Sequence, residues 1–365
     1  MTKRQLWRMF SAHLDGFLLF GIGLLVSTSL LVLYSAGDGG WSRVIGQSVN
    51  IAAALTVMWA VANTPLHYLM RAALPAYLLG LLLLIGVALF GDISHGARRW
   101  LNLGVATIQP SELMKIGVPL MLAWYFEKHE ATLGLKNYAI AALLLLIPVF
   151  LIARQPDLGT ALLISASGFY VLFLAGLSWR VMLGLALSAL ASAPFIWSSL
   201  HDYQRHRIEM LLDPTQDALG KGYHTIQGMI AVGSGGFSGK GYMGGTQTHL
   251  DFLPERTTDF IFAVYSEEFG FVGNMALLLM YFFVIGRGFV ITANASTYFT
   301  RLMAGSITLT FATYAFVNMG MVSGILPVVG VPLPLVSYGG TSMLTLLLGF
   351  GMLMSIETHK QLVKT

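Results

Sequence analysis

The stretch Phe17–Tyr34, FLLFGIGLLVSTSLLVLY, decides the fold class, because none of its 18 residues carries a charge. A helix needs ~20 mostly apolar residues to cross the hydrocarbon core of a bilayer, so this stretch is predicted to be a transmembrane helix. Lys3, Arg4 and Arg8 precede it, and no cleavage site of small residues follows it. We therefore expect an uncleaved first span.

Nine further apolar runs are predicted to form helices of the same kind, and the shorter ones, notably Glu112–Phe126 and Tyr138–Ala153, must extend into flanking polar residues or lie tilted in the bundle. They are Ile45–Ala62, Ala73–Phe90, Glu112–Phe126, Tyr138–Ala153, Leu158–Gly176, Val181–Trp197, Phe260–Ile285, Phe299–Val322 and Thr341–Ile356. Hydrophobic residues make up 56% of the chain and charged residues only 10%, against ~45–50% and ~25% in ordinary soluble domains. The composition predicts an all-α polytopic membrane protein, with one membrane domain over residues 1–365 and ten transmembrane helices.

The basic residues predict the orientation of these helices. An even number of spans puts both termini on one side of the membrane, and eleven basic residues fall on that side: Lys3, Arg4, Arg8, Arg71, Lys128, Lys136, Arg180, Arg287, Arg301, Lys360 and Lys364. Both termini are then cytoplasmic by the positive-inside rule. The net charge of +4 is too small to indicate binding to nucleic acid.

Two long connections differ in composition from the helices. The polar loop 201–258 joins the seventh and eighth helices, and we expect it on the extracytoplasmic side. The uncharged segment 323–340 contains Pro327, Pro332 and Pro334 together with several glycines. Irregular backbone is tolerated at membrane depth only where protein or a water-filled cavity covers it, so this segment is predicted to re-enter the bundle.

Charged residues beside apolar helices are candidates for function because they are expensive in a membrane. Glu112 and Lys115 stand three positions apart at the start of a helix, where they can form an ion pair. The pair either fixes helix packing or binds an anionic ligand. Asp157 begins the next helix but one, either as its N-cap or as a carboxylate facing an aqueous cavity.

Asp259 is the strongest candidate for a catalytic group. It lies in LPERTTDFIF, residues 253–262, where the long loop returns to the membrane. Partial burial there raises the pKa of a carboxylate toward the range of a general base, and Arg256 is close enough in sequence to hold it ionised. The alternative is an N-cap for the following helix. Glu267 and Glu268 are expected to line the same cavity as unpaired acids.

Other motif matches carry little weight. GKGYMG, residues 239–244, has the glycine spacing of a dinucleotide site but follows no predicted strand. There are no cysteines and no His-Glu-x-x-His motif, which argues against a dedicated zinc site. The identity of any metal stays unknown. A loosely held divalent cation, Mg or Mn, bridging acidic side chains and a substrate phosphate is compatible with the sequence.

Six stretches together resemble the SEDS family (shape, elongation, division and sporulation). They are Gly96–Leu101, Gln109–Lys115, Gln155–Thr160, Tyr203–Arg207, Phe252–Phe262, and the closing set Asn318, Gly324, Pro327, Gly330 and Leu335–Ser342. The similarity extends from the third predicted span to the C-terminus. The uninterrupted stretch Phe252–Phe262 and the short termini are most similar to the rod-shape elongation members of that family.

The resemblance implies an inner-membrane peptidoglycan glycosyltransferase that polymerises lipid II into β-1,4-linked strands during cell elongation. It implies that Asp259 is the general base, that the active site is periplasmic, and that the partners are a class B penicillin-binding protein transpeptidase and other elongation-complex proteins. The expected supporting or substrate-binding residues are Arg98, Arg99, Glu112, Lys115, Asp157, Arg205, Arg207, Arg256 and Ser337. Two other functions stay open: a lipid II flippase, because many spans and broken helices also suit a transporter, and a non-catalytic scaffold.

Overall fold

The computed structural model describes residues 13–94, 97–102, 107–155, 157–199, 205, 209, 221–250, 252–253 and 255–359. Within these ranges a helix corresponds to each of the ten predicted apolar runs, with ends that differ by a few residues. The ten helices are α2 (Gly16–Ala36), α3 (Trp41–Ala62), α4 (Leu66–Phe90), α5 (Pro110–Lys128), α6 (Leu135–Ala153), α7 (Leu158–Leu174), α8 (Trp179–Ser199), α12 (Ile261–Ala293), α13 (Tyr298–Val322) and α14 (Gly340–Thr358). Seven of the described helices are long and apolar enough to cross a membrane, so the number of ten crossings stays a prediction.

Short elements occupy three connections that the sequence analysis left without structure. Between α4 and α5, the strands β1 (Asp92–Ser94), β2 (Ala97–Asn102) and β3 (Thr107–Ile108) form a small antiparallel sheet in the order β1-β2-β3. The described part of the long loop contains α10 (Lys221–Ser234) and α11 (Thr246–His249), and a 3-10 turn, η1 (Glu130–Thr132), follows α5. The protein is therefore predominantly helical, with one minor sheet that the all-α prediction missed.

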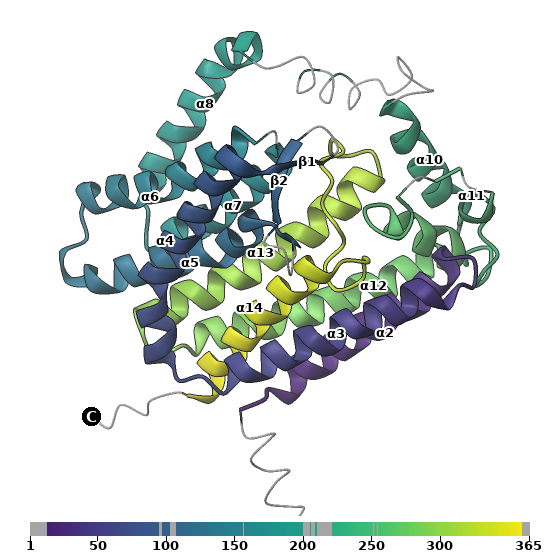
Figure 1. Cartoon of the computed structure of the whole chain (residues 1–365), viewed down its shortest axis with the longest axis horizontal. Coiled ribbons are helices and arrows are strands. Elements are labelled where there is room, and N and C mark those ends of the chain that lie inside the picture. Colours follow the sequence, from purple (N-terminus) through teal and green to yellow (C-terminus); the bar gives the residue numbers. More distant parts are fainter. Residues whose placement is uncertain are drawn as a thin grey trace, which may run out of the picture.

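The helices pack into a bundle around α13, which is buried over most of its length and contacts α5, α7 and α12. The last helix, α14, lies along α3 (Figure 1). In contrast, α8 stands at the edge of the bundle and exposes a series of leucines, among them Leu183, Leu187 and Leu190. An exposed apolar surface of this kind suits contact with lipid.

The two described ends of the chain meet at one face of the bundle. The rings of His13 and His359 stack with their centroids 4.4 Å apart. Nearby, Arg287 of α12 forms ion pairs with Asp15 at 2.5 Å and with Glu357 at 3.1 Å. The first and last helices thus begin and end on the same side, as an even number of spans requires.

Helix α12 is interrupted at Gly270, whose φ of 63° and ψ of −158° are not helical. The glycine-rich segment 235–245 packs against this break so closely that a Cβ at Gly239 would lie 2.0 Å from the carbonyl oxygen of Glu268. The backbone N–H of Gly241 donates to the same oxygen at 3.0 Å. The backbones pack too closely here for a side chain, which explains why GKGYMG has glycine at residue 239.

Candidate functional site

Asp259 lies in the turn 255–260, immediately before α12. Its side chain is partly buried, and within the described chain its carboxylate has no hydrogen-bond or ion-pair partner. Burial raises the pKa of Asp259 to about 6, and the negative charge of Glu255 acts in the same direction. The N-cap position of α12 belongs to Phe260, not Asp259, so the N-cap alternative for Asp259 is wrong.

Residues 323–339, between α13 and α14, form a non-helical covering segment over this carboxylate. Val331, Leu333 and Val336 of that segment are buried in the core. Gly330, with a positive φ of 73°, approaches the carboxylate so closely that a Cβ there would lie 3.4 Å from Asp259 Oδ2. Any larger side chain at residue 330 would therefore occupy the space in front of the acid.

Side chains from four helices hold this segment in place through its backbone. Three of these side chains each donate to one carbonyl oxygen at 2.7 Å: Ser29 of α2 to Val336 O, Tyr281 of α12 to Pro334 O, and Asn318 of α13 to Val331 O. The fourth, Gln47 of α3, makes two bonds. It donates to Ser337 O at 3.1 Å and accepts from Gly339 N at 3.2 Å. Buried backbone carbonyls are costly when left unpaired, so these bonds fix an otherwise unsupported loop.

Ser337 joins the same segment to the turn that carries Asp259. Its hydroxyl accepts from Leu333 N at 2.7 Å and donates to Thr258 O at 2.6 Å. The backbone N–H of Tyr338 donates to Thr257 O at 2.9 Å. Ser337 therefore fixes the turn that carries Asp259, because its hydroxyl bonds to the backbone of both segments.

Arg256 does not hold Asp259 ionised as the sequence analysis expected. Its guanidinium forms an ion pair with Asp38 at 2.5 Å and also donates to the carbonyl oxygen of Thr248. Asp38 follows the end of α2, so Arg256 ties the outer loop to the first helix. The charge partner that was expected for Asp259 is thus engaged elsewhere.

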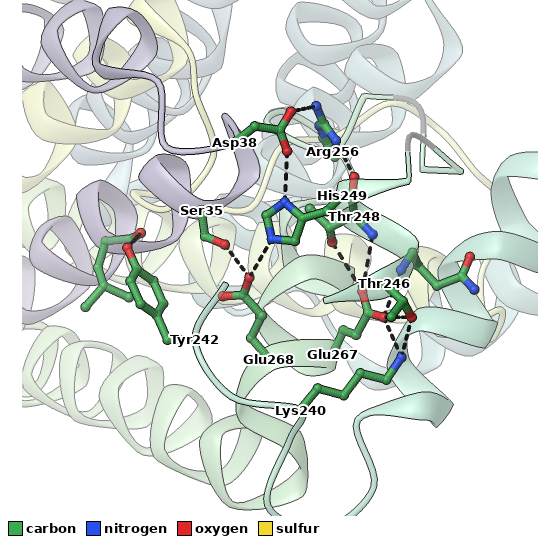
Figure 2. Close-up of polar contacts among 12 residues, drawn as sticks. Ser35, Asp38, Lys240, Tyr242, Thr246, Thr248, His249, Arg256, Glu267 and Glu268 are labelled. Carbon is green, nitrogen blue, oxygen red and sulfur yellow. Dashed lines mark hydrogen bonds and ion pairs between the residues drawn. The ribbon is translucent and has the colours of Figure 1, made fainter. Parts of the chain in front are cut away.

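Glu267 and Glu268 are not unpaired acids (Figure 2). The fully buried Glu267 accepts hydrogen bonds from Lys240 Nζ at 2.7 Å and from Gln247 N at 2.9 Å. Glu268 accepts from the hydroxyl of Ser35 and lies 3.9 Å from His249 Nε2. These contacts attach the outer cap, which consists of α10, α11 and the loop between them (residues 221–249), to α2 and α12. The two acids therefore hold the cap in place.

Asp157 occupies the N-cap position of α7, where its carboxylate accepts from Thr160 N at 3.3 Å. It also lies 3.8 Å from Arg99 Nε and accepts from Gln109 Nε2 at 3.4 Å. The next residues bring α7 against the covering segment, since a Cβ at Gly159 would meet Val329 O at 2.5 Å. Asp157 thus caps the helix and pairs with a cation at the same time.

Glu112 and Lys115 form the predicted ion pair, with Nζ and Oε1 2.6 Å apart. Thr345 of α14 donates to the other Glu112 oxygen at 3.2 Å, and Lys115 Nζ lies 5.1 Å from the centroid of the Tyr314 ring of α13. The pair lines a largely apolar pocket between α5, α13 and α14. Packing and ligand binding both remain consistent with this position.

The remaining candidates are only partly placed. Arg205 donates to the carbonyl oxygens of Trp197 at 3.0 Å and Ser198 at 2.7 Å, which secures it to the end of α8. The backbone of Arg98 pairs with Ile93 in the sheet, but its side chain and all of Arg207 lie outside the described residues. The described residues contain no group of three or more His, Asp or Glu side chains that could hold a metal ion.

Two residues of α3 that the sequence analysis did not assign to the site contact it directly. Gln47 holds the covering segment, and Arg43, one turn earlier, donates to Thr257 Oγ1 at 2.6 Å. The available signal was the i,i+4 spacing of two polar side chains in an apolar helix, which places them on one face.

The family model of cell cycle proteins named FTSW_RODA_SPOVE matches residues 11–362. Among curated proteins, the chain is 50% identical to the peptidoglycan glycosyltransferase MrdB of Escherichia coli K12, covering 99% of this chain and 98% of that protein. Among solved structures, it is similar to a chain of a peptidoglycan synthase complex described as coordinating polymerization and crosslinking (33% identity, TM-score 0.82, 94% and 97% covered). It is also similar to the rod shape determining protein RodA of Thermus thermophilus (31% identity, TM-score 0.71, 94% and 96% covered).

Proposed function

The chain belongs to the FtsW/RodA/SpoVE family of cell cycle proteins and is a peptidoglycan glycosyltransferase, and we propose that Asp259 is the general base with which it polymerises lipid II. One observation carries the proposal: Asp259 is a partly buried carboxylate without a charge partner in the described chain, and its pKa is raised to about 6. A carboxylate with that pKa is ionised near neutral pH yet basic enough to accept a proton.

In the proposed reaction, Asp259 accepts the proton of the GlcNAc 4-hydroxyl of the acceptor. That oxygen attacks the anomeric carbon of the donor from the face opposite its undecaprenyl pyrophosphate. One C–O bond forms as the bond to the pyrophosphate breaks, and the electron pair leaves with the pyrophosphate. A single displacement inverts the α-linked donor to a β-1,4 linkage.

The turn that carries Asp259 is suited to this role because its backbone is held from both sides. Ser337 bonds to Thr258 O and Asn318 bonds to Asp259 O at 2.8 Å. The side chain, in contrast, accepts no hydrogen bond from the residues that the structure describes. A base that is positioned through its backbone keeps its carboxylate oxygens available for the substrate hydroxyl.

The supporting cations have two kinds of proposed role. The predicted topology puts Arg98, Arg99, Arg205 and Arg207 on the extracytoplasmic side, where we propose that they bind the polar heads of donor and acceptor. Lys115 with Glu112, and Asp157 with Arg99, would shape the cavity that these heads enter.

The protein is an integral membrane protein of the inner membrane. We place its termini in the cytoplasm and Asp259 on the periplasmic side. In support, Asp15 and Asp38 flank α2, whose 21 residues span ~31 Å, so the face with His13 and His359 lies opposite the face with Arg256. The proposed partner is a class B penicillin-binding protein acting as transpeptidase, within the elongation complex.

The test is polymerisation of labelled lipid II by the purified protein and its transpeptidase partner. We expect glycan chains with the native protein and none with Asp259→Ala, while Glu130→Gln, which removes an exposed carboxylate of η1, keeps the native rate. Equal polymerisation by Asp259→Ala would disprove the base assignment. If labelled lipid crosses liposome membranes and no glycan forms, the protein is a lipid II flippase instead.

A further inference from the structure

Most described cations of the candidate site and the outer loop already pair with a carboxylate. Lys115 pairs with Glu112, Arg99 with Asp157, Lys240 with Glu267 and Arg256 with Asp38, at distances of 2.6, 3.8, 2.7 and 2.5 Å. A paired cation offers less charge to a bound anion, because its partner competes for the same donors. The leaving pyrophosphate needs a cation that is not occupied in this way.

Arg43 meets that requirement. It is exposed, and in the described part of the chain it has no carboxylate partner. Its Nη1 donates to Thr257 Oγ1 at 2.6 Å, and its guanidinium carbon lies 5.8 Å from the centroid of the Tyr338 ring. A hydroxyl and an aromatic face orient the guanidinium but leave its charge and its other donors available.

The position of Arg43 is fixed relative to Asp259. Thr257, which it contacts, is two residues before Asp259 in the same turn, and the Tyr338 N–H is bonded to Thr257 O at 2.9 Å. One helical turn further along α3, Gln47 holds the backbone on either side of Tyr338. The same small set of hydrogen bonds therefore positions both the carboxylate and the guanidinium.

We propose that Arg43 binds the pyrophosphate of the lipid-linked donor and stabilises it as a leaving group. The inference rests on the proposed function and names a substrate contact for it. Negative charge grows on the pyrophosphate as its bond to the anomeric carbon breaks. A guanidinium binds phosphate oxygens through two parallel N–H donors, and this contact strengthens as the charge develops.

Bulk phospholipids are a second source of phosphate for an exposed arginine at a membrane surface. Arg154 provides a matched control for that role. It is also an exposed arginine on the proposed outer side, its guanidinium carbon lies 4.9 Å from the Phe150 ring, and it has no carboxylate partner in the described chain. If Arg43 and Arg154 both served only to bind phospholipid headgroups, neutralising either one would have the same effect.

The first measurement is the steady-state rate of lipid II polymerisation by the full-length protein with its transpeptidase partner in nanodiscs. Arg43→Gln is expected to lower kcat/KM by ~10²-fold, the size of effect typical for loss of one donor to developing charge. Arg43→Lys should recover part of the rate, and Thr257→Val, which removes the orienting hydroxyl, should cause a smaller loss. Arg154→Gln should match the native protein.

The second measurement is inhibition by the released product. Undecaprenyl pyrophosphate should inhibit the native protein more strongly than undecaprenol, which has the same tail without phosphate. Arg43→Gln should abolish most of that difference, and Arg154→Gln should keep it. An unchanged difference in Arg43→Gln, or equal rate losses in the two glutamine variants, would overturn the proposal in favour of a lipid anchor.

The two readouts separate this inference from the proposed function. If Asp259→Ala still polymerises lipid II, the general base is wrongly assigned, but the inhibition experiment still tests Arg43. If Asp259→Ala is inactive while Arg43→Gln has native kinetics and native inhibition, the base stands and the pyrophosphate contact fails.

Discussion

Asn318 Nδ2 donates to the backbone carbonyl of Asp259 at 2.8 Å and to that of Val331 at 2.7 Å, so one buried amide of α13 links the proposed base to the segment that covers it. Neither bond touches the Asp259 carboxylate. The arrangement separates the positioning of the turn from the chemistry of its side chain, which makes Asn318 a positioning residue whose removal should act through geometry.

We expect Asn318→Ala to lower kcat for lipid II polymerisation at least ~10-fold and to destabilise the fold, because each buried carbonyl left unpaired costs ~1–3 kcal/mol. Thr308→Val is the control, since its hydroxyl donates to Ala304 O within α13. Thermal unfolding followed by tryptophan fluorescence and steady-state kinetics would measure both effects. Native kcat in a stably folded Asn318→Ala protein would contradict the positioning role.

The pH dependence of activity should report the raised pKa of Asp259. A general base must be ionised, so kcat/KM should fall as pH decreases through about 6, whereas an ordinary aspartate would stay ionised to ~4. Glu255 raises this pKa through its negative charge, so Glu255→Gln should move the midpoint to lower pH. A pH profile from 4.5 to 8 on both proteins makes the comparison.

A midpoint near 4 would show that Asp259 is not shifted. An unshifted profile in Glu255→Gln would show that another group controls the rate. The control, Glu130→Gln, removes an exposed carboxylate of η1. It should have the same midpoint as the native protein.

The Glu112–Lys115 pair can be tested for a role beyond packing. Glu112→Gln or Lys115→Met alone leaves one charge unpaired in a mostly apolar pocket, which is expected to cost ~3–5 kcal/mol. The double variant removes both charges and should recover most of the lost stability. Activity decides the function: a stable but inactive double variant indicates ligand binding, and a stable, active one indicates packing alone.

The sequence was most informative where its signal is local. The ten apolar runs are continuous stretches of sequence, and the Glu112–Lys115 pair and the cap at Asp157 depend on neighbours within about one helical turn. The structure has each of them. The small sheet was missed because its strands are short and lie in a charged connection. Their pairing depends on the register of the strands, and no alternation of polar and apolar residues in this stretch predicts it.

The partners of the acids were not predictable for a different reason. Arg256 pairs with Asp38, a residue 218 positions away, although Asp259 is its nearest carboxylate toward the C-terminus. The fold decides this choice by bringing the end of α2 to the outer loop. Arg43 was not predicted to be a site residue for the same reason, because its contact with Thr257 joins segments 214 positions apart.

Lys240 and Glu267 give the last prediction, which concerns the outer cap. Glu267 is completely buried and accepts from Lys240 Nζ at 2.7 Å, but Gln247 N at 2.9 Å and Thr248 N at 3.3 Å also donate to it. Lys240→Met should therefore destabilise by only ~1–3 kcal/mol, whereas Glu267→Ala, which strands all these donors, should cost more than ~3 kcal/mol. Thermal unfolding of both variants, with the exposed Lys136→Met as control, tests the order. Equal losses would mean that the ion pair alone holds the cap.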